Sequence, residues 1–326
     1  MLPPSAAGPI LWVKDMGTEL IAALMDGRIQ RTADNISEWR DPECPFPMEL
    51  SQAVYCSNPV SDIAILSWIE RELRVARIGA LDTNSTWKKE FSHKSDLRES
   101  INTNQELILS QFLWTYEMNA EILAMTSLNH QFAFVSMNQG VYLLNAEWEQ
   151  ADEIWRSEIP DWPKPWSNAI WKKNIRNGIT GKIETIGNVE TFVQSIFLEH
   201  SSLILFDERG SWIRLSIENG KEIGRGRLPF NGLNTGVWKG NEGWAIVEDN
   251  RRLHLLDSNF SIEQTHRVPG PVNHAIQSSL GWIWTGWRHD GSEKGIKDAK
   301  EIGLWIEENN GIAILSNDGN WHAFDN

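Results

Sequence analysis

The stretch from residue 232 to residue 270 most constrains how this chain can fold, because it contains four short strand-like segments separated by turn-forming residues. The segments are LNTGVW (233–238), GWAIVE (243–248), RLHLLD (252–257) and SIEQTHRV (261–268). Asn, Asp, Gly and Ser fill the intervals between them, and these residue types favour tight turns. The stretch therefore predicts one small antiparallel sheet of four strands.

Similar units recur along the 326-residue chain. Each combines an apolar strand, a polar turn and a second apolar strand, and these units lie at 10–27, 50–68, 120–140, 190–210, 233–250, 272–291 and 301–319. Repeated sheets of about 40 residues, with no long helices between them, predict an all-β β-propeller in which each sheet is one blade. A ring of blades buries both faces of every small sheet against its neighbours.

Tight turns after the second strand support this interpretation. They occur at Asp26-Gly27, Asn138-Gln-Gly140, Asp207-Glu-Arg-Gly210, Asp249-Asn250 and Asp318-Gly319. Asp, Asn and Gly adopt the positive φ that short hairpins require.

Seven strand pairs favour a single propeller domain over residues 1–326 with seven four-stranded antiparallel blades. The last two pairs start only about 30 residues apart, which leaves six blades as the alternative. In that alternative, residues 301–315 form the outer half of the sixth blade. We also expect the segment NWHAFD (320–325) to pair near ILWVKD (10–15) and close the ring.

Composition narrows the function. The chain has 18 Trp, and large aromatic rings bury extensive area where sheets stack, so we expect most of them between blades. Its net charge is −14 and its Lys and Arg residues form no cluster, which argues against nucleic-acid binding. Cys44 and Cys56 are too few for a disulfide framework and are expected to be reduced.

The N-terminus lacks the basic start and apolar core of a secretory signal. No apolar run of about 18 residues, the length of a membrane-spanning helix, occurs in the chain. We therefore expect a soluble cytoplasmic protein with no membrane span.

The segment VYLLNAEWEQADEIWR (141–156) resembles the quinoprotein-type repeat, in which a strand ends in Ala-Leu-Asp, turns at Thr-Gly-Lys and leads to a Trp. RLSIENGKEIGR (214–225) is similar, and ALDTNSTW (80–87) and HLLDSNF (254–260) match in part. The resemblance covers about four blades and implies a propeller of the quinoprotein-like or WD-repeat-like superfamily. It does not imply the quinone, because the chain has no adjacent Cys pair and no evident Ca²⁺ site. No cofactor is expected.

ALDTNSTW also has the spacing of the sialidase Asp-box. Ala80 and Asn84 stand where that motif prefers Ser and Gly, so this single copy argues little for a sialidase.

Three segments interrupt the repeats, at 92–119, 161–188 and 288–300. We assign the first two to connections between blades and the third to the loop after a second strand. In a four-stranded meander these connections leave the same end of the sheet. The three insertions are therefore expected on one face of the disc, where long loops on a rigid scaffold usually carry function.

Two groups of residues are candidate partner contacts on that face. The first comprises Trp162, Trp166, Trp171 and Lys172, and the second comprises Arg288, His289 and Asp290. Exposed Trp beside cations is typical of recognition surfaces. The alternative for the first group is that the Trp side chains cover a blade edge or plug the channel. For the second group it is a solvated charged loop without a role in binding or in acid–base chemistry.

No Gly-x-Ser-x-Gly elbow, His-Glu-x-x-His spacing, Cys–His zinc cluster or phosphate-binding loop occurs in the chain. The main hypothesis is therefore a non-enzymatic scaffold that recognises another protein. One alternative is a glycan or ester hydrolase with carboxylates or His at the channel mouth, where His274 is expected to face the channel. A second alternative is a lectin-like sugar binder with Trp-lined pockets repeated around the ring.

Overall fold

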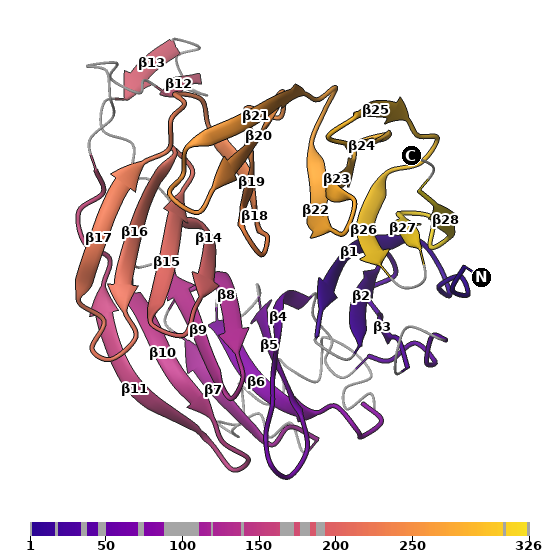
Figure 1. The fold of residues 1–326 in the computed structure, drawn as a ribbon. Helices are drawn as coiled ribbons and strands as arrows, with labels where there is room; N and C mark the ends of the chain where they lie inside the picture. The colour runs from indigo at the N-terminus through magenta and orange to yellow at the C-terminus, as the bar shows by residue number, and fades with distance from the viewer. Residues whose placement is uncertain are drawn as a thin grey trace.

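The chain folds into a ring of antiparallel sheets (Figure 1). The computed structural model describes residues 2–16, 19–33, 38–44, 50–70, 75–87, 111–118, 120–137, 140–163, 173–176, 183–186, 193–308 and 311–324. These residues contain strands, turns and irregular segments but no α-helix. In this described part, no helix has the length and apolar character needed to cross a membrane.

Seven blades follow one another in chain order. Blade one contains β1 (Ile10–Asp15), β2 (Leu20–Leu24) and β3 (Ile29–Arg31). Blade two contains β4 (Leu50–Cys56), β5 (Ile63–Glu70), β6 (Val75–Asp82) and β7 (Trp114–Met118). Blade three contains β8 (Ile122–Leu128), β9 (Gln131–Ser136), β10 (Gly140–Ala146) and β11 (Ala151–Glu158).

The remaining blades complete the ring. Blade four contains β14 (Val193–Leu198), β15 (Ser202–Asp207), β16 (Ser211–Ser216) and β17 (Glu222–Arg227). Blade five contains β18 (Asn234–Lys239), β19 (Gly243–Glu248), β20 (Arg252–Asp257) and β21 (Ile262–Arg267). Blade six contains β22 (Val272–Ser278), β23 (Gly281–Gly286), β24 (His289–Ser292) and β25 (Gly295–Asp298). Blade seven contains β26 (Gly303–Glu308), β27 (Ile312–Ser316) and β28 (Trp321–Ala323).

The predicted seven-bladed propeller is confirmed, and the six-bladed alternative is wrong because blades six and seven are separate sheets. Five blades have the predicted four strands, whereas blades one and seven have three named strands each. In blade one, residues 38–44 lie alongside β3 in the fourth position, through isolated bridges from Thr32 to Trp39 and from Ile29 to Glu43.

The expectation of an insertion at 288–300 is wrong, because this segment contains β24 and β25, the outer hairpin of blade six. The turns of this blade are only two residues long, at 279–280, 287–288 and 293–294. Because these turns are so short, a complete four-stranded blade fits into the roughly 30 residues between the last two predicted strand pairs.

The two other insertions leave opposite faces of the disc. The segment 92–119 lies mainly between β6 and β7, so it joins the third and fourth strands of blade two, and its end forms β7 itself. The segment 161–188 connects blade three to blade four and includes a separate hairpin, β12 (Lys173–Arg176) and β13 (Ile183–Ile186). The expectation that all three insertions share one face is therefore wrong. Residues 88–110, 164–172, 177–182 and 187–192 lie outside the described residues.

We call the two faces of the disc the crossing face and the opposite face. The crossing face carries the turns between second and third strands and the chain crossings between blades. The opposite face carries the turns between first and second strands and between third and fourth strands. This division follows from the meander order of the strands in each sheet.

The turns have the conformations that their residues predict. Gly27, Gly210 and Gly319 have φ values of 86°, 75° and 88°, and Asp249 and Asn250 both have φ of 53°. Glycine tolerates this left-handed region without a steric penalty, and Asn and Asp adopt it more readily than other side chains.

The core of the propeller lies between blades. Every residue of the second strands β2, β15 and β19 is buried. One apolar cluster joins Val135 of blade three to Leu205 of blade four, and equivalent clusters lie at the other seams. Tryptophan takes part as expected, since Trp68 and Trp284 are almost fully buried.

The ring closes by packing between blades one and seven. Ile10, Leu20 and Leu24 form one apolar cluster with Leu315 and Trp321. The backbone N–H groups of Ala6 and Ile10 each donate a 2.8 Å hydrogen bond to the turn of blade seven, at the carbonyls of Gly319 and Asn317. Among the described strands β28 pairs with β27, so the expected pairing of this segment with residues 10–15 is not what closes the ring.

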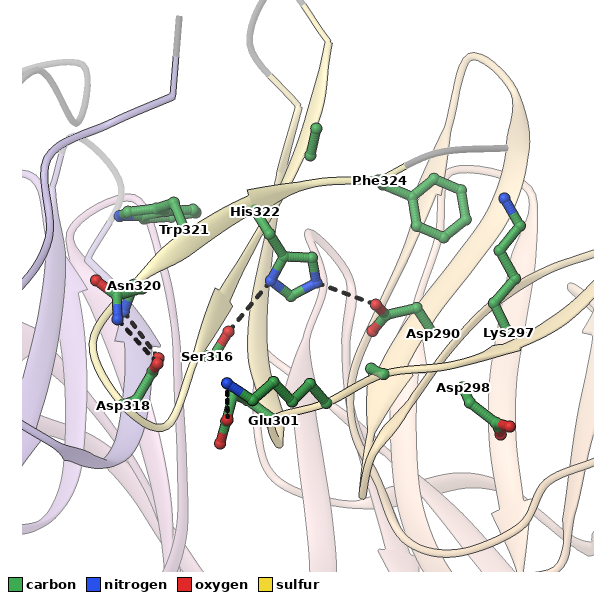
Figure 2. Close-up of a pocket in the computed structure, with 13 residues that line it drawn as sticks. Asp290, Lys297, Asp298, Glu301, Ser316, Asp318, Asn320, Trp321, His322 and Phe324 are labelled. Atoms are coloured by element: carbon green, nitrogen blue, oxygen red, sulfur yellow. Dashed lines mark hydrogen bonds and ion pairs between the residues drawn. The ribbon is translucent and has the colours of Figure 1, made fainter.

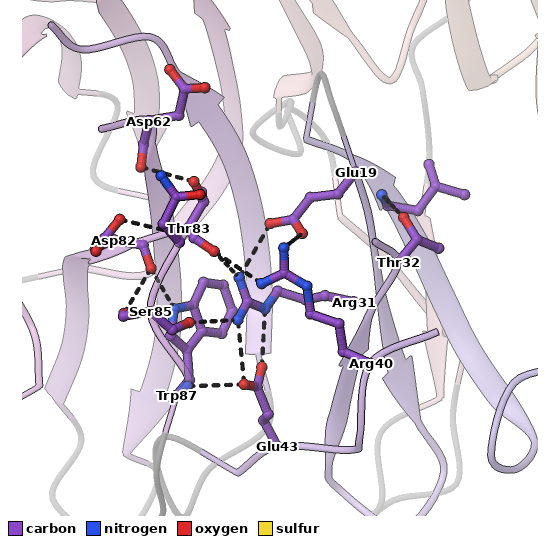
Figure 3. Close-up of polar contacts among 12 residues, drawn as sticks. Glu19, Arg31, Thr32, Arg40, Glu43, Asp62, Asp82, Thr83, Ser85 and Trp87 are labelled. Carbon is purple, nitrogen blue, oxygen red and sulfur yellow. Dashed lines mark hydrogen bonds and ion pairs between the residues drawn. The ribbon is translucent and has the colours of Figure 1, made fainter. Parts of the chain in front are cut away.

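A buried ion cluster fastens blade one to blade two (Figure 3). The Arg31 guanidinium donates to the Glu43 carboxylate at 2.9 Å and to Glu19 at 3.2 Å. It also donates to backbone carbonyls of the turn after β6, at Thr83 (2.7 Å) and Ser85 (2.8 Å). The guanidinium carbon lies 3.8 Å from the centre of the Trp87 ring. Because Arg31 is 1% exposed, these contacts replace all of its hydration.

We predict that Arg31→Met lowers the free energy of unfolding by about 3–5 kcal/mol, because it removes the cation from the buried Glu43 carboxylate and one of the two ion pairs of Glu19, which keeps Arg40. Urea unfolding followed by tryptophan fluorescence measures the change. The matched control is Arg28→Met, which removes an ion pair with Asp26 whose side chains are 45% and 50% exposed and so costs at most about 1 kcal/mol. Equal losses in the two variants would contradict the structural role of the buried cluster.

Candidate functional site

The first group of expected contacts lies in the connection between blades three and four. The structure describes Trp162, which is half-buried and packs against the apolar cluster of these two blades. This packing favours the alternative that Trp162 covers a blade edge. Trp166, Trp171 and Lys172 lie outside the described residues, and their role in partner binding stays a prediction.

The second group lies at the turn between β23 and β24 on the crossing face. Arg288 is exposed and has a φ of 55°, and its guanidinium carbon lies 6.0 Å from the ring centre of Trp287. Trp287 is itself 53% exposed. The turn therefore presents an aromatic ring and a cation side by side, two residue types that often dominate binding energy at protein interfaces.

The expectation that His289 contacts a partner is corrected by its burial. Its side chain is fully buried at the start of β24, and its Nδ1 lies 3.0 Å from the carbonyl of Trp287. The sequence predicts a loop over 288–300, whereas the turn ends at Arg288 and His289 is the first residue of β24. Trp287 was not singled out in the sequence, although its place between the strand-like GWIWTG and the charged RHD marks it as a turn residue.

Asp290 belongs to a chain of hydrogen bonds that joins blades six and seven (Figure 2). The Thr285 hydroxyl donates to one carboxylate oxygen at 2.6 Å, and His322 Nε2 lies 3.1 Å from the other. His322 Nδ1 lies 3.2 Å from the Ser316 hydroxyl. Ser316 is only 2% exposed, and its hydroxyl belongs to this hydrogen-bonded chain. We therefore interpret this Ser–His–Asp arrangement as a structural link between blades.

A cavity of about 430 Å³ lies beside this chain, between blade six and the outer edge of blade seven (Figure 2). It is lined by Asp290, Lys297, Asp298, Ala299, Lys300, Glu301, Ser316, Asp318, Asn320, Trp321, His322, Ala323 and Phe324. A second cavity of about 260 Å³ shares Asp290, Lys297 and Phe324 with it, and the two define a groove along the seam.

The crossing face has exposed apolar side chains in its turns. Met25, Met137 and Trp287 are 64%, 49% and 53% exposed, and all three follow a second strand. Trp287 is the one described tryptophan with most of its surface exposed, which does not match the repeated Trp-lined pockets expected of a lectin-like protein.

The two faces also differ in charge. Turns after second strands contain Arg28, Arg209, Arg251 and Arg288. The described turns of the opposite face contain no arginine, and their acidic residues include Asp62, Glu147, Glu149, Glu199, Glu218, Glu242 and Glu293. The crossing-face turns also contain Asp26, Glu208, Asp249 and Asp318, so their charges nearly balance, whereas Lys221 and Lys294 leave the opposite-face turns acidic.

His274 lies in the first strand of blade six, as the sequence predicts, but it is buried against blade seven. Its Nδ1 accepts a 3.0 Å hydrogen bond from the backbone N–H of Ile306, and its ring stacks on Trp305 with 3.8 Å between ring centres. Burial, assisted by the charge of Lys14, lowers the pKa of His274 to about 3. The imidazole is therefore neutral at physiological pH and acts as a packing residue of the seam.

In the described part of the chain, no group of three or more histidine, cysteine and carboxylate residues is arranged to hold a metal ion. Cys44 and Cys56 are both reduced, and burial raises the pKa of Cys56.

This geometry defines the class of protein as a seven-bladed β-propeller, the fold that the sequence resemblance implied. No family model matches the sequence, and no curated protein matches it.

Solved structures with the same fold cover almost the whole chain. The β-propeller domain of Cps50 (Swd1) from Myceliophteria thermophila is 9% identical with a TM-score of 0.61, over 98% of this chain and 96% of that one. The WD40 propeller of Doa1 is 9% identical with a TM-score of 0.59, over 98% and 93%. BamB from Moraxella catarrhalis is 10% identical with a TM-score of 0.54, over 97% and 95%. At these identities the similarity establishes the fold.

The state of His274 predicts a pH dependence for the seam between blades six and seven. A histidine whose folded pKa is depressed stabilises the fold above its ordinary pKa of 6.5, and this contribution is lost as the pH falls towards 3. Between these limits, each unit of decrease in pH should lower the free energy of unfolding of the wild type by about 1.4 kcal/mol relative to that of His274→Gln. The glutamine amide oxygen can accept the same hydrogen bond from Ile306 N–H, but the amide does not titrate.

Urea unfolding of both proteins at several pH values between 7 and 4 measures this difference. Both proteins have the same carboxylates, so the contribution of carboxylate titration cancels in the comparison. A constant difference across this range would show that His274 is not held neutral by burial.

Proposed function

We propose that this protein is a non-enzymatic interaction module that docks a partner protein on its crossing face. The turn of Trp287 and Arg288 is the observation that carries the proposal. Trp287 is the one described tryptophan that remains more than half exposed, at 53%, so much of its ring is available to a partner. An exposed aromatic ring beside a guanidinium is the combination that supplies much of the binding energy at protein interfaces.

The charges of the crossing face indicate the chemistry of the partner. Four blades each place an arginine in a turn on this face: Arg28, Arg209, Arg251 and Arg288. The chain as a whole is strongly acidic. Carboxylates in the same turns balance these arginines, so an acidic segment of the partner is repelled less by this face than by the opposite one and can pair with Arg288. Met25 and Met137 add adaptable apolar contacts on two other turns.

We also propose that the protein is cytoplasmic, as the sequence led us to expect. The reduced state of Cys44 and Cys56 supports it, because thiols persist in reducing compartments.

We predict that the double variant Trp287→Ala with Arg288→Asn loses at least about tenfold of the partner captured from an extract of the native source. Asn is chosen at position 288 because it tolerates the positive φ of that residue. Quantitative mass spectrometry compares the captured proteins, and raising the salt concentration should weaken capture because exposed charges are screened.

The matched control is Leu280→Ala. Leu280 is 55% exposed in a turn of the same blade, but on the opposite face, so capture should be unchanged. If the Leu280 variant loses the same proteins, or the double variant keeps them, the crossing face of blade six is not the docking site.

A further inference from the structure

We propose a second interaction site: the outer edge of β28 accepts an extended segment of a partner protein, which adds a fourth strand to the three described strands of blade seven. This inference goes beyond the proposed crossing-face site, because it concerns the rim of the disc and a different mode of binding. The added segment would form main-chain hydrogen bonds, as in other cases of strand addition to a sheet edge.

The hydrogen-bonding pattern of β28 leaves one edge available. The backbone N–H of Phe324 donates to Ile312, and that of Ser316 donates to the carbonyl of Asn320. Backbone groups alternate in direction along a strand, so Asn320, His322 and Phe324 face β27. The N–H and C=O groups of Trp321 and Ala323 then point away from β27, and no described strand pairs with them.

The composition of β28 differs from that of the true outer strands. The fourth strands of blades three to six are rich in charge: ADEIWRSE, EIGRGR, IEQTHR and GIKD. Charges on an outer strand discourage further pairing. β28 has the sequence WHA, without Lys, Arg, Asp or Glu, and its Trp321 is 7% exposed. β28 therefore has the character of an interior strand.

Space for an added strand exists next to this edge. The cavity of about 430 Å³ is bounded by Trp321, His322, Ala323 and Phe324 on one side and by β25 and the residues after it on the other. Figure 2 shows His322 directed toward Asp290 of blade six, with Phe324 near Lys297. A neighbouring strand that pairs with β28 would direct alternate side chains into this groove.

The lining of the groove specifies the incoming side chains. Carboxylates outnumber lysines in the lining of the larger cavity: it contains Asp290, Asp298, Glu301 and Asp318, but only Lys297 and Lys300. Lys300 lies 3.7 Å from Glu301. A basic side chain opposite His322 is therefore favoured.

The smaller cavity is bounded by Phe324 and Ile296, and Phe324 packs against the apolar cluster of Ile283, Ile306 and Ile314. An apolar side chain is therefore favoured opposite Phe324. The partner segment is thus an extended stretch of about five residues, with one basic and one apolar side chain two positions apart.

The experiment selects binders from phage-displayed random linear decapeptides on the wild-type protein. Enriched peptides should contain a Lys or Arg two positions from a large apolar residue. They should also slow hydrogen exchange of the Trp321 and Ala323 amides when bound.

The decisive variant is Ala323→Pro, which removes only the outward N–H and leaves the hydrogen bonds between β27 and β28 in place. It should weaken the selected peptides at least about tenfold in fluorescence anisotropy, whereas Ala323→Val, which keeps the N–H, should change their affinity less than about twofold. Ala299→Trp, which fills the cavity from blade six, should weaken them too and replaces the proline variant if that protein does not fold.

The proposal is overturned if no peptide is enriched or if the enriched peptides bind the proline and valine variants equally. It is also overturned if the wild type self-associates through this edge in sedimentation, since a second copy would then be the occupant. The peptides should bind the Trp287→Ala, Arg288→Asn protein normally. Loss of binding in that variant alone would assign them to the crossing face instead.

Discussion

Burial of both faces of each small sheet is the constraint on which the rest of this structure depends. A four-stranded sheet with Val135 or Leu205 at its centre exposes apolar surface on two sides, and only a neighbouring blade on each side removes that surface from water. The ring must therefore close. Here closure relies on apolar side chains of blades one and seven and on the N-terminal segment hydrogen-bonded to the last turn, with each blade built from consecutive strands.

The period of the strands and the chemistry of the turns were sufficient to predict the propeller and its seven blades. Short apolar strands followed by Asp, Asn and Gly are local signals, and the positive φ values at Gly210 and Asn250 confirm them. The outer strands were harder, because they face solvent and lack an apolar pattern. β24 and β25 have the sequences HDGS and GIKD, which are polar and contain glycine. Such sequences are typical of loops, so the sequence predicts an insertion at 288–300.

The candidate site could be predicted only in part. The sequence predicts a loop with exposed contacts around Arg288. The burial of His289 could not be predicted, because it depends on where the two-residue turn ends and β24 begins. Contacts between blades, such as His322 with Asp290, join residues 32 positions apart and have no local signature. Likewise, the unpaired edge of β28 can be recognised only by comparing its sequence with those of the fourth strands in the other blades.

Two features of the surface support a role in recognition. The crossing face combines exposed Met and Trp side chains with arginines from several blades, and these positions lie in short turns between paired strands. The edge of blade seven offers main-chain hydrogen bonds at the rim, so a partner that meets the disc at both places would gain affinity through its second contact.

The central claim is that partners dock on the crossing face. Hydrogen-exchange mass spectrometry of the protein with and without its captured partner tests this claim most directly. The account predicts slower exchange in the turns at 25–28, 208–210, 249–251 and 287–288, with the turns at 199–201, 240–242 and 279–280 unchanged. Protection confined to the latter turns would place the partner on the opposite face and contradict the account.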